Sequence, residues 1–230
     1  KCRHRPPNIY IYTYPALTLY KVLQDGTERS YSTLAFNEAG DQLASVGAWP
    51  DYLLTLWRWE EEAIVLRSKA FSQDVYTVKF SPYFDGNLTT SGTGHIRFWK
   101  MAATFTGLKL QGLIGKFGVV ELSDVVAFVE MPDGKVLSST ETGELLMWDG
   151  GLIKVMLVRP GKKPCHDGAV EVLLHDRSSN TIVTGGADGY VRLWDFNKVN
   201  DAEPEEDAHH LAITPVDEVK VCPGGRIRSL

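Results

Sequence analysis

The chain has 230 residues, of which 43% are hydrophobic and 23% are charged, and its formal net charge is −5. This balance is typical of a globular protein with a sizeable core, while the negative charge argues against a nucleic-acid partner, since binding to a phosphate backbone needs a positive field. The apolar runs are only a handful of residues long, well short of the roughly 18 residues that a membrane-spanning helix requires, so we expect no membrane contact.

Cysteine usage indicates a reducing compartment. Cys2, Cys165 and Cys222 are far apart and odd in number, which favours neither a disulfide framework nor a zinc module. We therefore expect no metal and no cofactor, and a location in the cytoplasm or the cytoskeleton. The chain begins at Lys1 without a charged and then apolar leader, and we interpret it as a piece of a longer polypeptide.

Short alternating strands that end in an aromatic residue recur along the chain. The closing residues are Tyr12, Trp57, Trp99, Trp148 and Trp194, which gives separations of 45, 42, 49 and 46 residues. A period of about 40 to 50 residues is typical of one blade of a β-propeller. The first marker closes a weaker strand at 9–12.

The segments around each marker also repeat, with the period-2 alternation and β-branched content of strands. In chain order, the first full blade is predicted at 32–37, 42–46, 54–57 and 64–69. The second is predicted at 76–82, 87–91, 96–99 and 106–111, and the third at 125–132, 135–139, 145–149 and 153–159. The last covers 169–176, 181–184 and 191–195, and ends near 217–221.

The predicted fold is all-β: a WD40-type β-propeller of about four and a half four-stranded blades. Helical spacing of apolar residues is never sustained beyond two turns, and a parallel α/β sheet has no room for crossover helices. We expect one partial propeller over residues 1–230, an incomplete piece of a seven-bladed ring, with an acidic loop insertion at 200–210. Such an arc would be open and would leave strand edges exposed at both ends.

The last repeat resembles the WD-repeat pattern closely, with His166 before its inner strand, Thr184 in the second strand, Asp188 in the next turn and Trp194 as the marker. The resemblance implies that Trp194 donates its indole N–H to the Thr184 hydroxyl, which bonds His166, whose other ring nitrogen meets Asp188. Linked in this way, four polar groups can be buried between blades. A hydroxyl, an imidazole and a carboxylate could also form a hydrolase triad, but a hydroxyl turned toward tryptophan favours a structural role.

The other blades depart from this pattern. Their hydroxyl positions hold Ser45, Thr90 and Ser138, but Thr93 and Thr142 stand near the place of the turn carboxylate. We expect these blades to lack the network and to rely on packing of their tryptophans.

Two further groupings have a structural and a functional interpretation. Cys165 next to His166 could be a thiol and its base, but adjacent residues of a strand point to opposite faces. The pair His209 and His210 follows an acidic run at 203–207 and could capture a metal, although such a run is more often a solvated insertion.

An interaction site is a separate hypothesis for the turn before Trp57. The interval from Ser45 to Trp57 is 12 residues, two longer than the 10 from Thr184 to Trp194. Aromatic residues at such an insertion are common interface anchors, although local packing explains them as well. The residues proposed for partner contact are Trp49, Asp51, Tyr52 and Trp59.

The amino-acid sequence of the second blade and of its neighbours resembles one particular family more than it resembles WD repeats in general. The segments 91–101 and 104–112, followed by 117–118, 132–138, 148–154 and 185–192, resemble the axonemal WD-repeat family of cilia- and flagella-associated protein 44. The likeness covers most of the chain, from about Ile9 to Asp195.

This resemblance implies a place and not a chemistry. The family belongs to the tether that holds an inner-arm dynein on the doublet microtubule, together with a related axonemal WD-repeat protein numbered 43, and it supports ciliary motility. It implies a non-enzymatic scaffold in the axoneme, with proteins as partners and no small-molecule substrate. The alternatives are a WD-repeat adaptor outside the cilium, in transport or ubiquitin ligation, and a hydrolase that uses His166 and Thr184.

Overall fold

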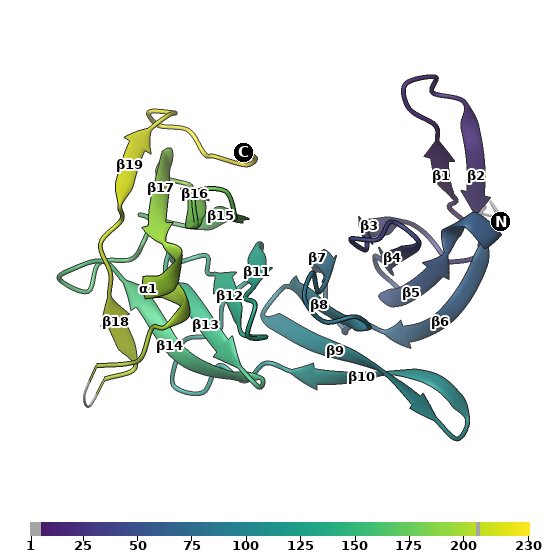
Figure 1. Cartoon of the computed structure of the whole chain (residues 1–230), viewed down its shortest axis with the longest axis horizontal. Helices are drawn as coiled ribbons and strands as arrows, with labels where there is room; N and C mark the ends of the chain where they lie inside the picture. Colours follow the sequence, from purple (N-terminus) through teal and green to yellow (C-terminus); the bar gives the residue numbers. More distant parts are fainter. Residues whose placement is uncertain (1–5, 206–207) are drawn as a thin grey trace. The chain divides into compact units, whose positions relative to one another are not determined.

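The computed structural model describes residues 6–205 and 208–230, so Cys2 and the predicted loop residues Glu206 and Asp207 lie outside it. The described chain forms five β-sheets in two compact units, one ending at Leu113 and the other beginning at Ile114. Figure 1 labels the elements of both units. No described helix is long and apolar enough to cross a membrane.

The first unit begins with a two-stranded hairpin of β1 (Ile9–Tyr12) and β2 (Leu19–Leu23). The next four strands form one antiparallel sheet in chain order: β3 (Tyr31–Phe36), β4 (Gln42–Gly47), β5 (Leu53–Arg58) and β6 (Ala63–Lys69). A short 3-10 helix (Trp59–Glu61) links the last two. The second sheet has the same order: β7 (Val75–Phe80), β8 (Asn87–Gly92), β9 (His95–Thr104) and β10 (Gly107–Ile114).

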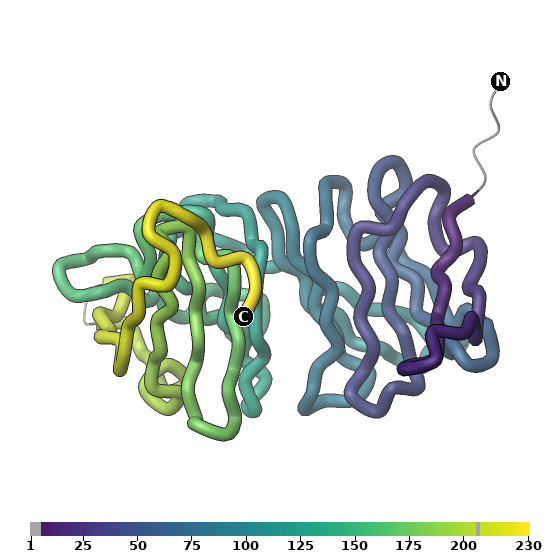
Figure 2. Tube along the Cα trace, turned by 90° about the horizontal axis from the view of Figure 1, so that it is seen from above, coloured from purple at the N-terminus to yellow at the C-terminus, as the bar shows by residue number. Residues whose placement is uncertain are grey.

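The second unit holds two more sheets, whose strands run alternately up and down in Figure 2. One consists of β11 (Phe128–Glu130), β12 (Val136–Ser139), β13 (Leu145–Asp149) and β14 (Leu152–Val158). The other consists of β15 (Val170–Asp176), β16 (Thr181–Gly186), β17 (Tyr190–Asp195) and β19 (Asp217–Lys220). Helix α1 (Phe196–Asn200) and β18 (His210–Ala212) lie in the chain between β17 and β19.

Four four-stranded blades and one half blade are therefore present, and the predicted propeller fold class is confirmed. Most strand boundaries differ by one or two residues from the prediction. Larger differences include β9, which continues to Thr104 beyond its predicted end at 99, and the inner strand predicted at 125–132, of which only Phe128–Glu130 forms a strand. Just before β11, the amide of Ala127 donates to the Ser139 hydroxyl while the Ser139 amide donates to the Ala127 carbonyl, so a side chain replaces one of the two backbone hydrogen bonds of this residue pair.

The segment between β17 and β19 contains two elements that the strand pattern did not predict. Asp195 caps α1 by accepting a hydrogen bond from the Lys198 amide, and the helix buries Phe196 and Val199 in the core of the second unit. β18 then pairs in parallel with β14, so it adds a fifth strand to the neighbouring sheet. A parallel strand at a sheet edge covers backbone groups that would otherwise be unpaired.

Each unit has its own core between adjacent sheets. In the first unit, Val46, Leu54 and Leu56 pack with Val78 and Trp99, and in the second, Leu137, Leu145 and Met147 pack with Leu173 and Trp194. The four blade tryptophans are all at most 2% exposed. Burial of this kind contributes roughly 25 cal/mol per Å² of apolar surface, and it fixes the strands that carry the polar groups described below.

Candidate functional site

The structure brings His166, Thr184, Asp188 and Trp194 together in one chain of hydrogen bonds. The indole Nε1 of Trp194, on β17, donates to the Thr184 Oγ1, on β16, at 2.9 Å. Thr184 Oγ1 lies 2.7 Å from His166 Nε2, and His166 Nδ1 lies 2.9 Å from Asp188 Oδ1. The loop before β15 supplies the histidine and the β16–β17 turn supplies the carboxylate.

This network is closed to solvent at the positions that a hydrolase would need. His166 and Thr184 have no exposed surface, and Trp194 is 1% exposed. The Thr184 hydroxyl is engaged by the indole on one side and by the imidazole on the other. Because a nucleophile must reach its substrate, the arrangement suits structural support of the blade.

A fifth member of the network is Arg192, which the sequence analysis missed. Its Nη1 lies 2.8 Å from Asp188 Oδ2, its Nε lies 2.8 Å from Glu218 Oε2, and its side chain is only 3% exposed. The guanidinium therefore links the β16–β17 turn to the outer strand β19. An arginine four residues after the turn aspartate, at a strand position two before the tryptophan, was the signal that could have predicted it.

Charges in the network follow from burial and hydrogen bonding. Burial lowers the pKa of His166 despite the neighbouring carboxylate, so the imidazole is neutral at pH 7. Burial would raise the pKa of Asp188, but hydrogen bonds from His166 and Arg192 outweigh it and hold that pKa well below its usual range. A neutral His166 that donates from Nδ1 to Asp188 accepts at Nε2, which orients the Thr184 hydroxyl toward it.

The other three blades keep half of this network. Trp57 donates to the Ser45 hydroxyl at 2.8 Å, Trp99 to Thr90 at 2.9 Å, and Trp148 to Ser138 at 2.8 Å. The expectation that these tryptophans rely on packing alone was therefore wrong. A buried indole N–H without an acceptor is costly, and the hydroxyl at this position of β4, β8 and β12 supplies the acceptor.

Asp51 is the counterpart of Asp188 in the first full blade. It stands six residues before Trp57, as Asp188 stands six before Trp194. Its carboxylate accepts hydrogen bonds from the Thr27 hydroxyl, at 2.8 Å, and from the Glu28 amide, as Asp188 accepts from the Asp167 amide. The sequence analysis named Asp51 for partner contact, but the structure engages its carboxylate within the blade.

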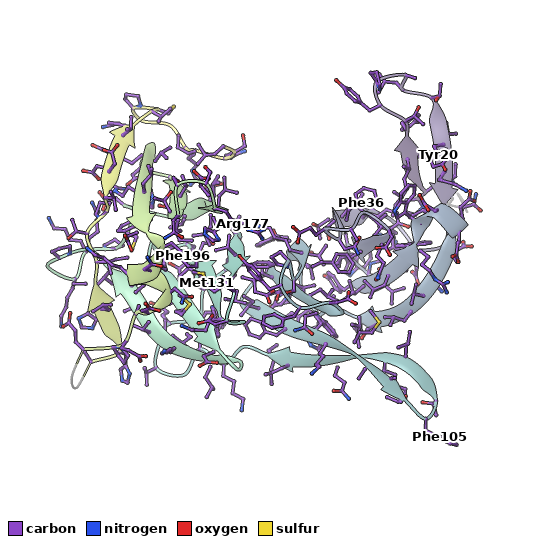
Figure 3. All side chains as sticks on the ribbon, in the orientation of Figure 1. Tyr20, Phe36, Phe105, Met131, Arg177 and Phe196 are labelled. Carbon is purple, nitrogen blue, oxygen red and sulfur yellow. The ribbon has the colours of Figure 1, made fainter. Side chains whose placement is uncertain are left out.

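The other residues proposed for partner contact lie at opposite ends of β5. Trp49 and Tyr52 are in the turn before this strand, where Trp49 is 56% exposed and lies under the Arg29 guanidinium at 4.2 Å. Trp59 follows the strand, donates to the Gly40 carbonyl at 2.6 Å and makes edge contacts with Tyr20 and Phe36, both labelled in Figure 3. The structure does not bring Trp59 together with Trp49.

Cys165 and the histidine pair have separate surroundings. Cys165 is buried with its Sγ 3.4 Å from the Leu157 carbonyl, and burial raises the pKa of its thiol to about 12, which leaves no thiolate at neutral pH. His209 and His210 line a cavity with Glu144 and Lys162. Within residues 6–205 and 208–230, no three His, Cys, Asp or Glu side chains are grouped to hold a metal.

Comparisons with known proteins agree with this architecture. Residues 160–195, which contain the complete network, match the family model "WD domain, G-beta repeat". The β-propeller domain of Cps50 (Swd1) from Myceliophteria thermophila superimposes with a TM-score of 0.65 at 17% identity, covering 90% of this chain and 64% of that one. At this identity the likeness concerns the fold alone.

Three curated relatives extend the likeness to nearly the whole chain. Cilia- and flagella-associated protein 44 from Chlamydomonas reinhardtii is 69% identical over 97% of this chain, and that from Mus musculus is 51% identical over 94%. The relative of the same name from Trypanosoma brucei brucei is 40% identical over 100% of the chain. The chain spans only 12 to 14% of the length of these relatives. The chain therefore contains one matched WD repeat, and it is similar over nearly all its length to one region of cilia- and flagella-associated protein 44.

Proposed function

We propose that this chain is part of a non-enzymatic scaffold of the motile cilium or flagellum, in the tether that anchors an inner-arm dynein to the doublet microtubule. The observation that carries the proposal is the 69% identity, over 97% of the chain, with a relative named for cilia and flagella. Two further relatives of that name, from a mammal and a trypanosome, support it. The proposed partners are inner-arm dynein, the related WD-repeat protein numbered 43 and the doublet itself.

The absence of catalysis is part of this proposal, and it rests on the buried network. The only grouping that invited a hydrolase hypothesis has its hydroxyl and imidazole at 0% exposure, and both are occupied by hydrogen bonds to Trp194 and Asp188. This argues for a role in holding the blade together. A solvent-accessible cleft that joins His166 to Thr184 would revive the hydrolase alternative.

A propeller segment suits a tether for a mechanical reason. Sheets with hydrogen-bonded tryptophans and charged links such as Arg192 to Glu218 resist shear between strands. The loops and outer edges vary without disturbing the sheets, so each blade can present its own contact surface to a partner.

The alternative is an adaptor outside the cilium, and localisation separates the two. The test uses a chimera: the full-length relative from Chlamydomonas reinhardtii, with its matching region replaced by this chain and with a fluorescent tag. The chimera is expressed in Chlamydomonas reinhardtii cells that lack their own cilia- and flagella-associated protein 44. The proposal predicts fluorescence along the flagella that remains with the axoneme after detergent extraction, together with restored swimming. The unmodified relative is the matched control. Fluorescence confined to the cell body would contradict the proposal and favour the adaptor.

A further inference from the structure

The outer hairpin of the second blade is longer than its counterparts. Strands β5, β13 and β17 each end one residue after the blade tryptophan, at Arg58, Asp149 and Asp195. Strand β9 instead continues for five residues beyond Trp99, to Thr104, before β10 returns from Gly107. Figure 1 shows this pair as a long finger that ends in a tight turn.

The tip of this finger presents one aromatic side chain. Phe105 is fully exposed, and Figure 3 shows it at the end of the hairpin, away from Tyr20 and Phe36 of the same unit. The turn beneath it is fixed, because Thr104 Oγ1 donates to the Gly107 carbonyl at 2.7 Å and Gly107 adopts a positive φ of 107° in open space. Phe105 therefore contributes no packing to its own blade, although it is held in a defined place.

The finger also differs in charge from the rest of the chain. The 35 residues from Gly86 to Val120 contain no aspartate or glutamate, whereas the whole chain carries 29 acidic and 24 basic residues. Lys100 on β9 and Lys109 on β10 are exposed, and neither forms an ion pair within the described part of the chain. The hairpin is thus a basic projection with an apolar tip on an acidic chain.

We propose that the β9–β10 hairpin is a docking finger, which inserts Phe105 into an apolar pocket on an acidic protein surface of the same assembly. A buried aromatic anchor ringed by polar and charged groups is the usual arrangement of a strong protein contact. Thr104 and Thr106 flank the aromatic ring, and Lys100 and Lys109 provide the complementary charge. A membrane surface is a poorer match, since stable anchoring there needs a broader apolar face than Phe105 and the half-exposed Leu108 provide.

The inference rests on the proposed function, and the test uses the same full-length chimera, purified and rebound to salt-stripped, detergent-extracted Chlamydomonas axonemes. We expect Phe105→Ser to weaken rebinding about ten-fold, whereas Phe105→Leu should retain most of it. Lys100→Glu combined with Lys109→Glu should weaken rebinding at low salt, and this difference should shrink as the NaCl concentration rises. The matched control is Tyr14→Ser, at a 90% exposed aromatic residue in the β1–β2 turn.

The outcomes distinguish failure of the docking finger from failure of the proposed function. Equal rebinding of the Phe105→Ser and unsubstituted chimeras would overturn the docking finger and leave the proposed function standing. Failure of the unsubstituted chimera to bind axonemes would overturn both. The second measurement is flotation of the chimera with vesicles of phosphatidylcholine and phosphatidylserine. If Phe105 were needed for binding to vesicles but not for binding to the membrane-free axonemes, the protein-docking proposal would also be overturned. Thermal melting of each variant should be unchanged, because Phe105 makes no contact that folding depends on.

Discussion

The Nη1 atom of Arg192 lies 2.8 Å from the Oδ2 of Asp188, inside a blade where both side chains are at most 8% exposed. This ion pair connects the hydrogen-bonded chain from Trp194 to the outer strand β19, since Arg192 also holds Glu218. The buried polar network of the last blade is therefore a charged structure, and its members should be sensitive to the loss of any one partner.

Loss of the guanidinium should destabilise the last blade strongly. Arg192→Met keeps much of the side-chain volume but leaves the buried Asp188 carboxylate without its counter-charge, which typically costs about 3 to 5 kcal/mol. The control is Arg226→Met, which removes an ion pair to Glu171 from a side chain that is 56% exposed and should cost at most about 1 kcal/mol. Chemical denaturation of the two variants measures both values, and equal losses would contradict the assigned role of Arg192.

Trp194→Ala should lower the free energy of unfolding by about 3 to 5 kcal/mol, since it removes a buried ring and leaves the Thr184 hydroxyl without its donor. Trp49→Ala, at a tryptophan that is 56% exposed, should change it much less. Any loss of partner binding in Trp194→Ala should follow from unfolding. A variant that stays fully folded yet loses a partner would show that Trp194 acts at an interface.

The stability of the chain should fall as the pH is lowered from about 7 to about 5. Burial holds the folded-state pKa of His166 below that of an unfolded histidine, near 6.5, so the unfolded chain takes up a proton first. The contribution of His166 to stability is therefore fully present above the pKa of the unfolded histidine and is lost as the pH falls below it. His166→Gln should make this decline shallower, although His175, whose pKa burial also lowers, keeps part of it. The measurement is the free energy of unfolding, obtained by chemical denaturation at several pH values in this range. The same pH dependence in the unsubstituted chain and in His166→Gln would refute the assignment to His166.

Cysteine alkylation should distinguish the two described thiols in the native chain. At pH 8, iodoacetamide should modify the exposed Cys222 and leave Cys165 unmodified, because burial raises the pKa of Cys165 to about 12 and denies access to the reagent. Peptide mass spectrometry before and after unfolding measures both sites, and unfolding should equalise them. Rapid native labelling of Cys165 would restore the possibility of a thiol nucleophile beside His166.

The blade period was predictable because each strand carries its own alternation and each blade its own tryptophan. Trp57, Trp99, Trp148 and Trp194 fix the register of β5, β9, β13 and β17, so these strands were found to within a few residues at their starts. The extension of β9 past Trp99 was missed, since alternation weakens in the run of small and polar residues up to Thr104. Strand β18 was missed for a different reason: three residues that pair in parallel with β14 leave no local pattern.

The polar network was predictable only in part. The spacing of His166, Thr184 and Asp188 matches the WD-repeat pattern and could be recognised in the sequence. The role of Arg192 depends on its hydrogen bond to Glu218, which lies 26 residues further along the chain and belongs to no local pattern. Asp51 was assigned to a surface because it stands in a longer turn next to Trp49. Its spacing of six residues from Trp57 was the better guide, because that spacing sets its place in the blade.

Cross-linking of intact axonemes tests the central claim most directly. In Chlamydomonas cells that carry the chimera with this chain, lysine cross-links identified by mass spectrometry should join the chain to inner-arm dynein subunits, to the related WD-repeat protein numbered 43 or to doublet tubulin. Cross-links from Lys100 and Lys109 would place the docking finger at one of these contacts. A chimera that is present in the axoneme but cross-links to none of these proteins would contradict the proposal that this chain is part of a dynein tether.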